Sequence, residues 1–414
     1  VAVTLGPLDL VVVDSLETAL HTHFGWSRFR AGQRPVVEAV LSGRDALAVL
    51  PTGGGKSLCY QLPALIRGGL VVVISPLVAL MEDQVLQLRR RGIAAACLHA
   101  GLDPARRQQA MAALRDESLR LLYLAPERLQ GEATQRLLET HAAEGRLVAL
   151  AVDEAHCISA WGHDFRPDYR RLGLIRRLCP GVPMLALSAT AAPRVRADIL
   201  RLLDLRSPLV QVSSARRENL RYAMQRRPRD PMPQVLEALE QSRGATLIYA
   251  RTRRSVEHWA ERLQGQSVEA TPYHAGLDPA TRQTALTQFL EQERPVLVAT
   301  VAFGMGVDRG DVGLVLHLDL PSTPEGYLQE SGRAGRDGQP ARCLVLFSPG
   351  DRTSLGWAMQ AAAGQGTTAD ERHRLDLAQQ QLRRMEAVAE GEMCREQALL
   401  LAVGELVDPC GRCD

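Results

Sequence analysis

A ten-residue segment that occurs twice constrains the fold of this 414-residue chain more than any other feature. It begins at His99 as HAGLDPARRQ and at His274 as HAGLDPATRQ, and the two copies differ at one position. Asp-Pro often opens a helix, so a shared helix start would account for three or four of the matching residues. The longer identity favours the duplication of one domain.

Short apolar runs alternate with amphipathic helical stretches around both copies of this segment. Near-continuous apolar strands that alternate with helices are typical of parallel sheets covered on both faces. We therefore predict an α/β fold with two tandem parallel-sheet domains, over residues 1–207 and 208–348, and a proline-rich surface loop at residues 226–234. The expected strands lie in LVVVISP, RLLYLAP, LVALAVDEAH and PMLALSAT, and then in ATLIYA, PVLVAT, LVLHLDL and ARCLVLF.

After Ser348 the strand-like runs stop and a helical pattern begins. Thr368 and Glu371 have the spacing of a capping box at the start of a helix. A small helical region is therefore expected over residues 349–414. Its longest helix is expected to carry one apolar stripe, formed by Leu375, Ala378, Leu382, Met385 and Ala389.

Charge and cysteine content limit the surroundings in which the chain can work. The net charge is +2, so a polyanionic partner must be met by a local patch rather than by a global field. Eight cysteines scattered in a chain of this size suit a reducing compartment. The apolar stretch near the N-terminus is broken by Asp14 and Glu17 and has no basic lead-in. We therefore expect a cytoplasmic protein without a signal peptide or a membrane span.

The stretch VLPTGGGKS, residues 49–57, predicts a strand, a glycine-rich turn and the start of a helix. Glycines let backbone N–H groups surround phosphate oxygens, and the helix dipole favours the anion. The strict Walker pattern opens with a glycine that this chain lacks, so the match is a variant, and a plain flexible turn is the alternative.

Lys56 favours the phosphate-binding interpretation, because it is the only lysine in the chain. A compact ammonium fits between the β- and γ-phosphates of a nucleotide, whereas a broad, planar guanidinium does not. We predict that ATP binds here and that Ser57 is a ligand of Mg²⁺. The predicted ATP contacts in this loop are Thr52, Gly53, Gly54, Gly55, Lys56 and Ser57.

Two further motifs would complete an ATPase site. In LAVDEAH a buried strand ends at Asp153, which we expect to hold Mg²⁺, and at Glu154, which we expect to orient and deprotonate the attacking water. Alone, this tetrapeptide could be a solvated helix start. In YLQESGRAGRDG, Arg333 and Arg336 would stabilise transition-state charge, although arginine pairs are usually solvated.

The motifs together resemble the catalytic core of the RecQ family of DNA helicases, within helicase superfamily two. The resemblance runs from about Leu20 to the end of the chain and implies two RecA-like domains followed by a small helical zinc-binding subdomain. It also implies that Arg30 and Gln33 contact adenine and that Trp26 stacks on it, and an aromatic anchor of a half-buried helix is the alternative for Trp26. The segments that carry it are FGWSRFRAGQ, TGGGKSLCYQ, SPLVALMEDQV, YLAPERL, DEAHCISAWGHDFRPDY, SAT, YHAGL, VATVAFGMGVDRGDV and QESGRAGRDG, in that order.

Aromatic residues gather directly after the DEAH motif, in residues 157–169, which we call the aromatic loop. They make up 4% of the chain, yet three fall within nine residues here. Such residues suit stacking on unpaired bases and gripping phosphates, and a local hydrophobic anchor is the alternative. The resemblance implies that the loop senses single-stranded DNA and that Ser188 and Thr190 link hydrolysis to domain motion. The predicted DNA-binding residues are His156, Trp161, His163, Phe165 and Arg166. Ala160 stands where the family often has glutamine, which leaves the strength of this coupling open.

Cys394, Cys410 and Cys413 have a spacing that suits a zinc ion. Three thiolates do not close a structural zinc site, and RecQ-family zinc modules add a fourth cysteine just beyond this point. We therefore expect an incomplete zinc-binding subdomain over residues 349–414. A set of unconnected, reduced cysteines is the alternative.

The sequence thus predicts an ATP-dependent DNA helicase core that needs Mg²⁺ and Zn²⁺. The resemblance implies 3′ to 5′ movement on single-stranded and partly duplex DNA, in repair or recombination, by a monomer. An RNA helicase of the same superfamily is one alternative. A DNA-binding or annealing module that ATP merely switches is the other.

Overall fold

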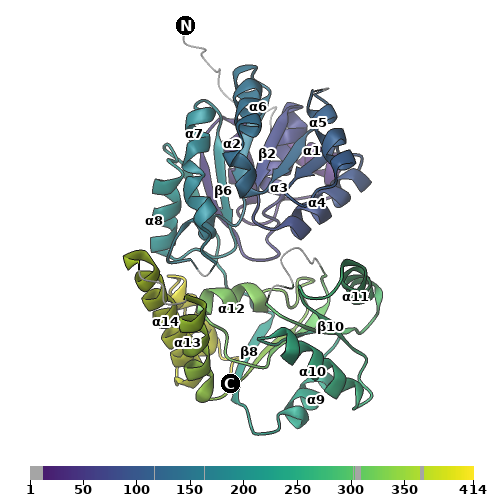
Figure 1. Cartoon of the computed structure of the whole chain (residues 1–414), viewed down its shortest axis with the longest axis vertical. Helices are drawn as coiled ribbons and strands as arrows, with labels where there is room; N and C mark the ends of the chain where they lie inside the picture. Colours follow the sequence, from purple (N-terminus) through teal and green to yellow (C-terminus); the bar gives the residue numbers. More distant parts are fainter. Residues whose placement is uncertain (1–12, 116, 163, 302, 304–308, 364–367) are drawn as a thin grey trace.

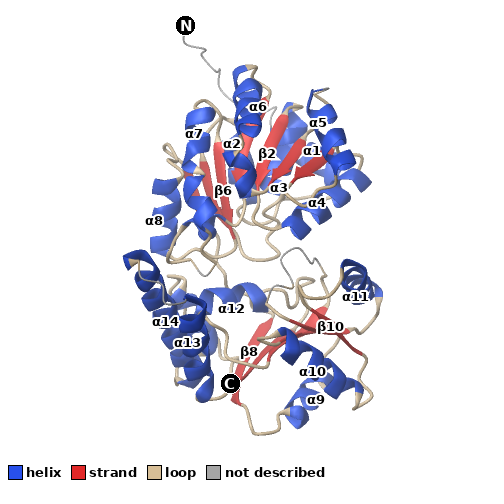
Figure 2. Ribbon diagram, in the orientation of Figure 1, coloured by secondary structure: helices blue, strands red, loops and turns tan. Residues whose placement is uncertain are grey.

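The chain forms two α/β domains, one above the other, with a group of helices beside the lower one (Figure 1). The computed structural model describes residues 13–414 except 116, 163, 302, 304–308 and 364–367. Figure 2 shows the strands of each domain lying between helices. In that described part, no helix is long and apolar enough to cross a membrane.

The upper domain has, within the described residues, a seven-stranded parallel sheet. Across the sheet the strands are β3 (Ala95–Leu98), β4 (Leu121–Leu124), β2 (Leu70–Ile74), β5 (Leu147–Val152), β6 (Met184–Ser188), β1 (Ala46–Val49) and β7 (Leu209–Val212). The helices are α1 (Val13–Phe24), α2 (Gln33–Leu41), α3 (Leu58–Arg67), α4 (Val78–Arg90), α5 (Pro104–Arg115), α6 (Glu132–Ala143), α7 (Gly173–Leu178) and α8 (Pro193–Leu202). Short 3₁₀ helices are η2 (Pro126–Gln130), η3 (Ala155–Ile158) and η4 (Pro167–Arg171).

The lower domain has a parallel sheet of six described strands. Their order is β10 (Ala270–Tyr273), β11 (Val296–Ala299), β9 (Ala245–Tyr249), β12 (Val312–His317), β13 (Ala341–Phe347) and β8 (Leu220–Arg226). The helices that accompany it are α9 (Met232–Glu240), α10 (Arg253–Gln264), α11 (Pro279–Glu291) and α12 (Pro324–Ser331). The predicted α/β class with two parallel-sheet domains is therefore confirmed.

The two sheets have matching strand orders, which supports a duplicated domain. The order β10-β11-β9-β12-β13-β8 repeats β3-β4-β2-β5-β6-β1. The two copies of the repeated segment follow the equivalent strands β3 and β10. Their histidines, His99 and His274, are both buried.

The predicted boundary between residues 207 and 208 is wrong by several residues. β7 pairs with β1 over Leu209–Val212, so the first domain extends past residue 208. β7 is an edge strand whose Val210 and Val212 are exposed, so its sequence is not a buried apolar run. The edge strands β8 and β10 were also missed, because β8 is rich in polar residues and β10 contains a proline. The proline-rich stretch predicted as a loop connects β8 to α9 and includes the first turn of α9.

The C-terminal region is helical, as predicted, and consists of α13 (Gly350–Ala363), α14 (Ala369–Glu390) and α15 (Arg395–Ala402). The Thr368–Glu371 capping box is present at the start of α14. In the predicted stripe Leu382, Met385 and Ala389 are buried, whereas the other two residues are half-buried. Because the buried residues join the core on one face of the second sheet, α14 and α15 pack as part of that domain.

Candidate nucleotide-binding site

The glycine-rich loop between β1 and α3 has a backbone that requires glycine. Gly53 and Gly55 have φ values of 80° and 74°, in the left-handed region that favours glycine. A Cβ atom on Gly54 would lie 2.8 Å from the carbonyl oxygen of Pro51. The loop leads through the half-buried Lys56 to Ser57, the N-cap residue of α3. An anion at this loop would therefore meet the N-terminus of a helix.

Gln33, the first residue of α2, and Arg30, three residues before it, hold the glycine-rich loop in place. The Gln33 side chain donates to the carbonyl oxygens of Gly54 at 3.1 Å and Gly55 at 3.0 Å. The Gln33 side chain also accepts from the backbone N–H of Arg30 at 2.8 Å, and the Arg30 guanidinium donates to the Gly53 carbonyl. The predicted adenine contacts are thus bound to the loop itself, and their contact with adenine stays a prediction.

Trp26 lies beside this segment with 43% of its surface exposed. One partner of its ring is Phe24, at 5.5 Å between centroids and 21° between planes. The exposed area of Trp26 leaves room for a second flat group. Its predicted stacking on adenine is compatible with this position.

Asp153 and Glu154 follow β5 directly and are both buried. Asp153 accepts the backbone N–H of Glu154 at 3.0 Å, and the Tyr169 hydroxyl donates to the Asp153 carbonyl at 2.9 Å. Burial, and secondly the charge of Glu154, raise the pKa of Asp153 to about 7, while the nearby cation of Lys56 opposes this rise. Two buried carboxyl groups beside a phosphate loop are a donor set that fits a divalent cation.

His156 connects this carboxylate pair to the SAT motif. Its Nδ1 lies 3.3 Å from the Glu154 carboxylate and 3.0 Å from the Ser188 hydroxyl. That hydroxyl also donates to the Thr190 carbonyl at 2.6 Å. Burial disfavours a charge on His156, yet neighbouring groups, chiefly Cys157 and Glu154, raise its pKa to about 10. The predicted coupling residues therefore form a continuous polar chain with Glu154.

The two predicted arginines reach the first domain at different places. A Cβ atom on Gly53 would lie 3.5 Å from the Arg336 side chain, so Arg336 lies against the glycine-rich loop. Arg333 is buried and lines a cavity of about 420 Å³ together with Glu154 and His156. The sequence treated these two arginines as one pair, whereas the structure separates them.

The same cavity contains residues that the sequence analysis missed. The Tyr249 and His317 rings stack at 4.8 Å, and Nε2 of His317 lies 2.7 Å from the Glu330 carboxylate. Both rings come from the carboxyl ends of predicted strands, where loops of α/β sheets carry chemistry. Their position at the ends of these strands was the feature of the sequence that could have identified them as candidate site residues.

Among the predicted DNA-binding residues of the aromatic loop, Trp161, Phe165 and Arg166 are half-buried, and His163 lies outside the described residues. Arg166 donates to the Pro76 carbonyl at 3.0 Å and to the Asp164 carboxylate at 3.1 and 3.0 Å. Tyr169, the last residue of the aromatic loop, is buried, so the alternative of a hydrophobic anchor applies to it.

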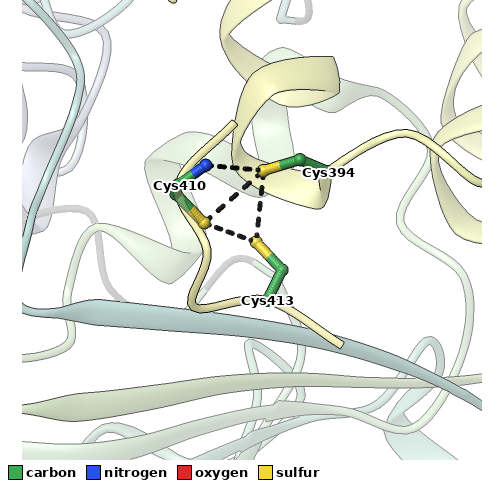
Figure 3. A group of neighbouring side chains, drawn as sticks. All are labelled: Cys394, Cys410 and Cys413. Atoms are coloured by element: carbon green, nitrogen blue, oxygen red, sulfur yellow. Dashed lines mark hydrogen bonds between the residues drawn. The ribbon is translucent and has the colours of Figure 1, made fainter. Parts of the chain in front are cut away.

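The three C-terminal cysteines meet at one point (Figure 3). Their sulfur atoms are 3.0 to 3.7 Å apart. The Cys394 sulfur accepts the backbone N–H of Cys410 at 3.3 Å, and the Cys413 sulfur accepts that of Glu396 at 3.4 Å. Clustered thiols that accept backbone N–H groups fit a zinc ion, and within the described residues the group has three members.

Removal of zinc is expected to destabilise the C-terminal region. A zinc ion held by the three thiolates would join the start of α15 to the last residues of the chain, so a chelator is expected to release it and to lower the Tm by about 5 °C. Zinc release can be measured with a colorimetric indicator, and the Tm by calorimetry. A Cys410→Ser variant should start at the lower Tm and show no further change with the chelator. An unchanged wild-type Tm and no released zinc would contradict a metal site.

Comparisons with known proteins agree with this geometry. Residues 30–199 match the DEAD/DEAH box helicase family and residues 230–338 match the helicase conserved C-terminal domain. The chain is 39% identical to the ATP-dependent DNA helicase RecQ of Haemophilus influenzae, over 96% of this chain and 62% of that protein. It is 40% identical to the probable ATP-dependent DNA helicase RecS of Bacillus subtilis, over 81% of this chain and 67% of that protein. The chain thus spans less than two thirds of the first of these relatives.

Solved structures support the fold alone, since their sequences are distant. The DEAD-box helicase Mss116 bound to single-stranded RNA has a TM-score of 0.66 at 16% identity, covering 98% of this chain and 94% of that one. Helicase Lhr of Mycobacterium smegmatis, bound to single-stranded DNA and AMP-PNP, has a TM-score of 0.64 at 19% identity. That match covers 92% of this chain and 58% of Lhr. The predicted pair of RecA-like domains is therefore confirmed.

Proposed function

We propose that this chain, which belongs to the RecQ family of ATP-dependent DNA helicases, couples ATP hydrolysis to movement along single-stranded DNA. The observation that carries the proposal is the position of Arg336, which reaches from the second domain to Gly53 of the first. A cleft with cations on both sides stabilises transition-state charge only when the domains are closed. Hydrolysis and product release would therefore be tied to domain motion.

Each residue of the cleft has a proposed task. Lys56 and the N–H groups of residues 53–57 bind the phosphates, while Arg30 and Gln33 hold the loop and face the adenine. Ser57 and Asp153 would hold Mg²⁺, which supplies positive charge beside the phosphates when it is bound. Glu154 orients the attacking water and takes its proton.

DNA would act on this site through the aromatic loop. The loop continues directly from the Asp153–Glu154 turn, and Tyr169 returns to bond the Asp153 carbonyl. His156, directly before the loop, bonds Ser188 of the SAT motif. A strand that moves the loop therefore changes the surroundings of the catalytic carboxylate through a few direct contacts.

Family membership supports finer proposals. These are 3′ to 5′ movement, unwinding of partly duplex DNA, and a role in repair or recombination, for a monomer in the cytoplasm. The protein should bind the DNA strand mostly through its phosphates and through stacked bases. Its affinity for DNA should therefore fall as salt is added and depend little on the DNA sequence.

The test is steady-state ATP hydrolysis with and without a single-stranded oligonucleotide. DNA should raise kcat at least about tenfold at low salt, and added salt should raise the DNA concentration needed. RNA of the same sequence should stimulate less. Equal or stronger stimulation by RNA would favour an RNA helicase. DNA-stimulated turnover without strand separation would favour a module that ATP merely switches, and no stimulation would reject the proposal.

A further inference from the structure

The two half-buried rings of the aromatic loop touch the C-terminal helix α14. The Trp161 ring and the His373 imidazole meet edge to face at 5.9 Å between centroids. The Arg374 guanidinium lies over the Phe165 ring at 5.6 Å. These residues lie in the first two turns of α14, and the upper end of α14 lies just below α8 and the first domain (Figure 1).

Cations of the first domain lie on the same two rings. The Arg194 guanidinium lies 3.3 Å from the Trp161 ring centre, and the Arg170 guanidinium lies 5.0 Å from that of Phe165. Each ring that is suited to stack on an unpaired base therefore already contacts one cation of its own domain and one residue of α14. A base cannot share a ring face with a side chain that occupies it.

Contacts lead from this junction to the catalytic carboxylates. Arg194 lies in the first turn of α8, which directly follows the SAT motif. The Ser159 hydroxyl of the loop donates to the Asp198 carboxylate of α8 at 2.7 Å. Ser188, at the other end of that connection, bonds His156 beside Glu154. A shift of the loop away from α14 would therefore also act on α8 and on the SAT segment.

We propose that the start of α14 is a brake on the aromatic loop, with His373 and Arg374 holding Trp161 and Phe165 until single-stranded DNA displaces them. The inference rests on the proposed function, because it assigns the loop to DNA sensing. Stacking of a base on an aromatic side chain is generally stronger than an exposed cation–π contact, so DNA can displace the helix. α14 also packs on α12, which leads into Arg333 and Arg336. Displacement of α14 would therefore also change the packing of α12 and, through it, the positions of these two arginines.

The experiment compares the whole chain with a His373→Ala/Arg374→Ala variant. The variant should reach half-maximal ATPase stimulation at about three- to tenfold less single-stranded DNA, since two weak contacts no longer oppose stacking. Its hydrolysis without DNA should rise about twofold. The matched control is Arg383→Ala, which removes an exposed arginine from the same helix and should leave both quantities unchanged.

Binding of a fluorescent oligonucleotide without ATP gives a second readout. Tighter binding by the variant supports the brake. Weaker binding would mean that His373 and Arg374 contact DNA themselves, and unchanged binding with unchanged stimulation would mean a purely structural contact; either result overturns the inference. If the double variant fails to fold, Arg374→Gln removes one contact while keeping a long polar side chain, and the same criteria apply to it.

The two proposals fail in different ways. A wild-type chain that DNA does not stimulate overturns the proposed function and the brake together. A wild-type chain that DNA stimulates, beside a variant with unchanged or weaker DNA response, overturns the brake alone.

Discussion

A Lys56→Arg variant is expected to hydrolyse ATP about 10³-fold more slowly than the wild type, with or without DNA. Lys56 lies half-buried in a loop whose glycines leave little room around the backbone. The Arg30 guanidinium already bonds the Gly53 carbonyl, and the Arg336 side chain already lies against Gly53. A third guanidinium would crowd this cradle, and its planar group cannot replace a point charge between two phosphates. The measurement is kcat from a coupled assay.

The single lysine also allows nucleotide binding to be measured separately. An amine-reactive reagent can modify one lysine side chain in this chain, at position 56. Bound ATP should protect it, as read by peptide mass spectrometry. The matched control is Arg136→Lys on the exposed face of α6, which adds an unprotected lysine and should leave kcat unchanged. A Lys56→Arg chain whose kcat stays within about twofold of the wild type would show that the ammonium is not needed.

The sequence was sufficient for those parts of the fold and the site that depend on local pattern. Buried strands and the glycine-rich loop have strong patterns of their own, because apolar runs and glycine spacing follow from burial and from backbone geometry. The repeated segment added the duplication of the domain, and the structure agrees because its two copies follow the equivalent strands β3 and β10. The edge strands β7, β8 and β10 have no such pattern, because each contains exposed positions, polar residues or a proline, so the domain boundary was placed too early.

Contacts between distant segments could not be read from local patterns. Arg333 and Arg336 are three residues apart, and only the tertiary structure shows that Arg333 lines a cavity together with Glu154 whereas Arg336 lies against Gly53. Gln33 was matched to adenine, and its bonds to the glycine-rich loop became visible only once α2 was placed beside α3. The junction of the aromatic loop with α14 joins residues about two hundred positions apart, which no spacing rule connects.

An Arg336→Ala variant is expected to lose about 10³-fold in kcat while its affinity for ATP changes little. The side chain comes from the second domain and lies against Gly53, so its charge reaches the phosphates only in the closed cleft. Such a cation acts mainly on the transition state, and loss of one of this kind typically costs 10³-fold or more.

The control variant for this prediction changes another arginine of the second domain. Arg342→Ala removes an arginine of β13 that bonds Gln241 at the end of α9, and should leave kcat unchanged. Binding is measured with a fluorescent ATP analogue and hydrolysis by phosphate release. If Arg336→Ala weakened binding as much as it slowed hydrolysis, the arginine would hold the ground state, and closure of the domains would not be the step that it serves. If kcat stayed near the wild-type value, the contact with Gly53 would be one of packing only, and the argument that ties hydrolysis to domain motion would lose its main support.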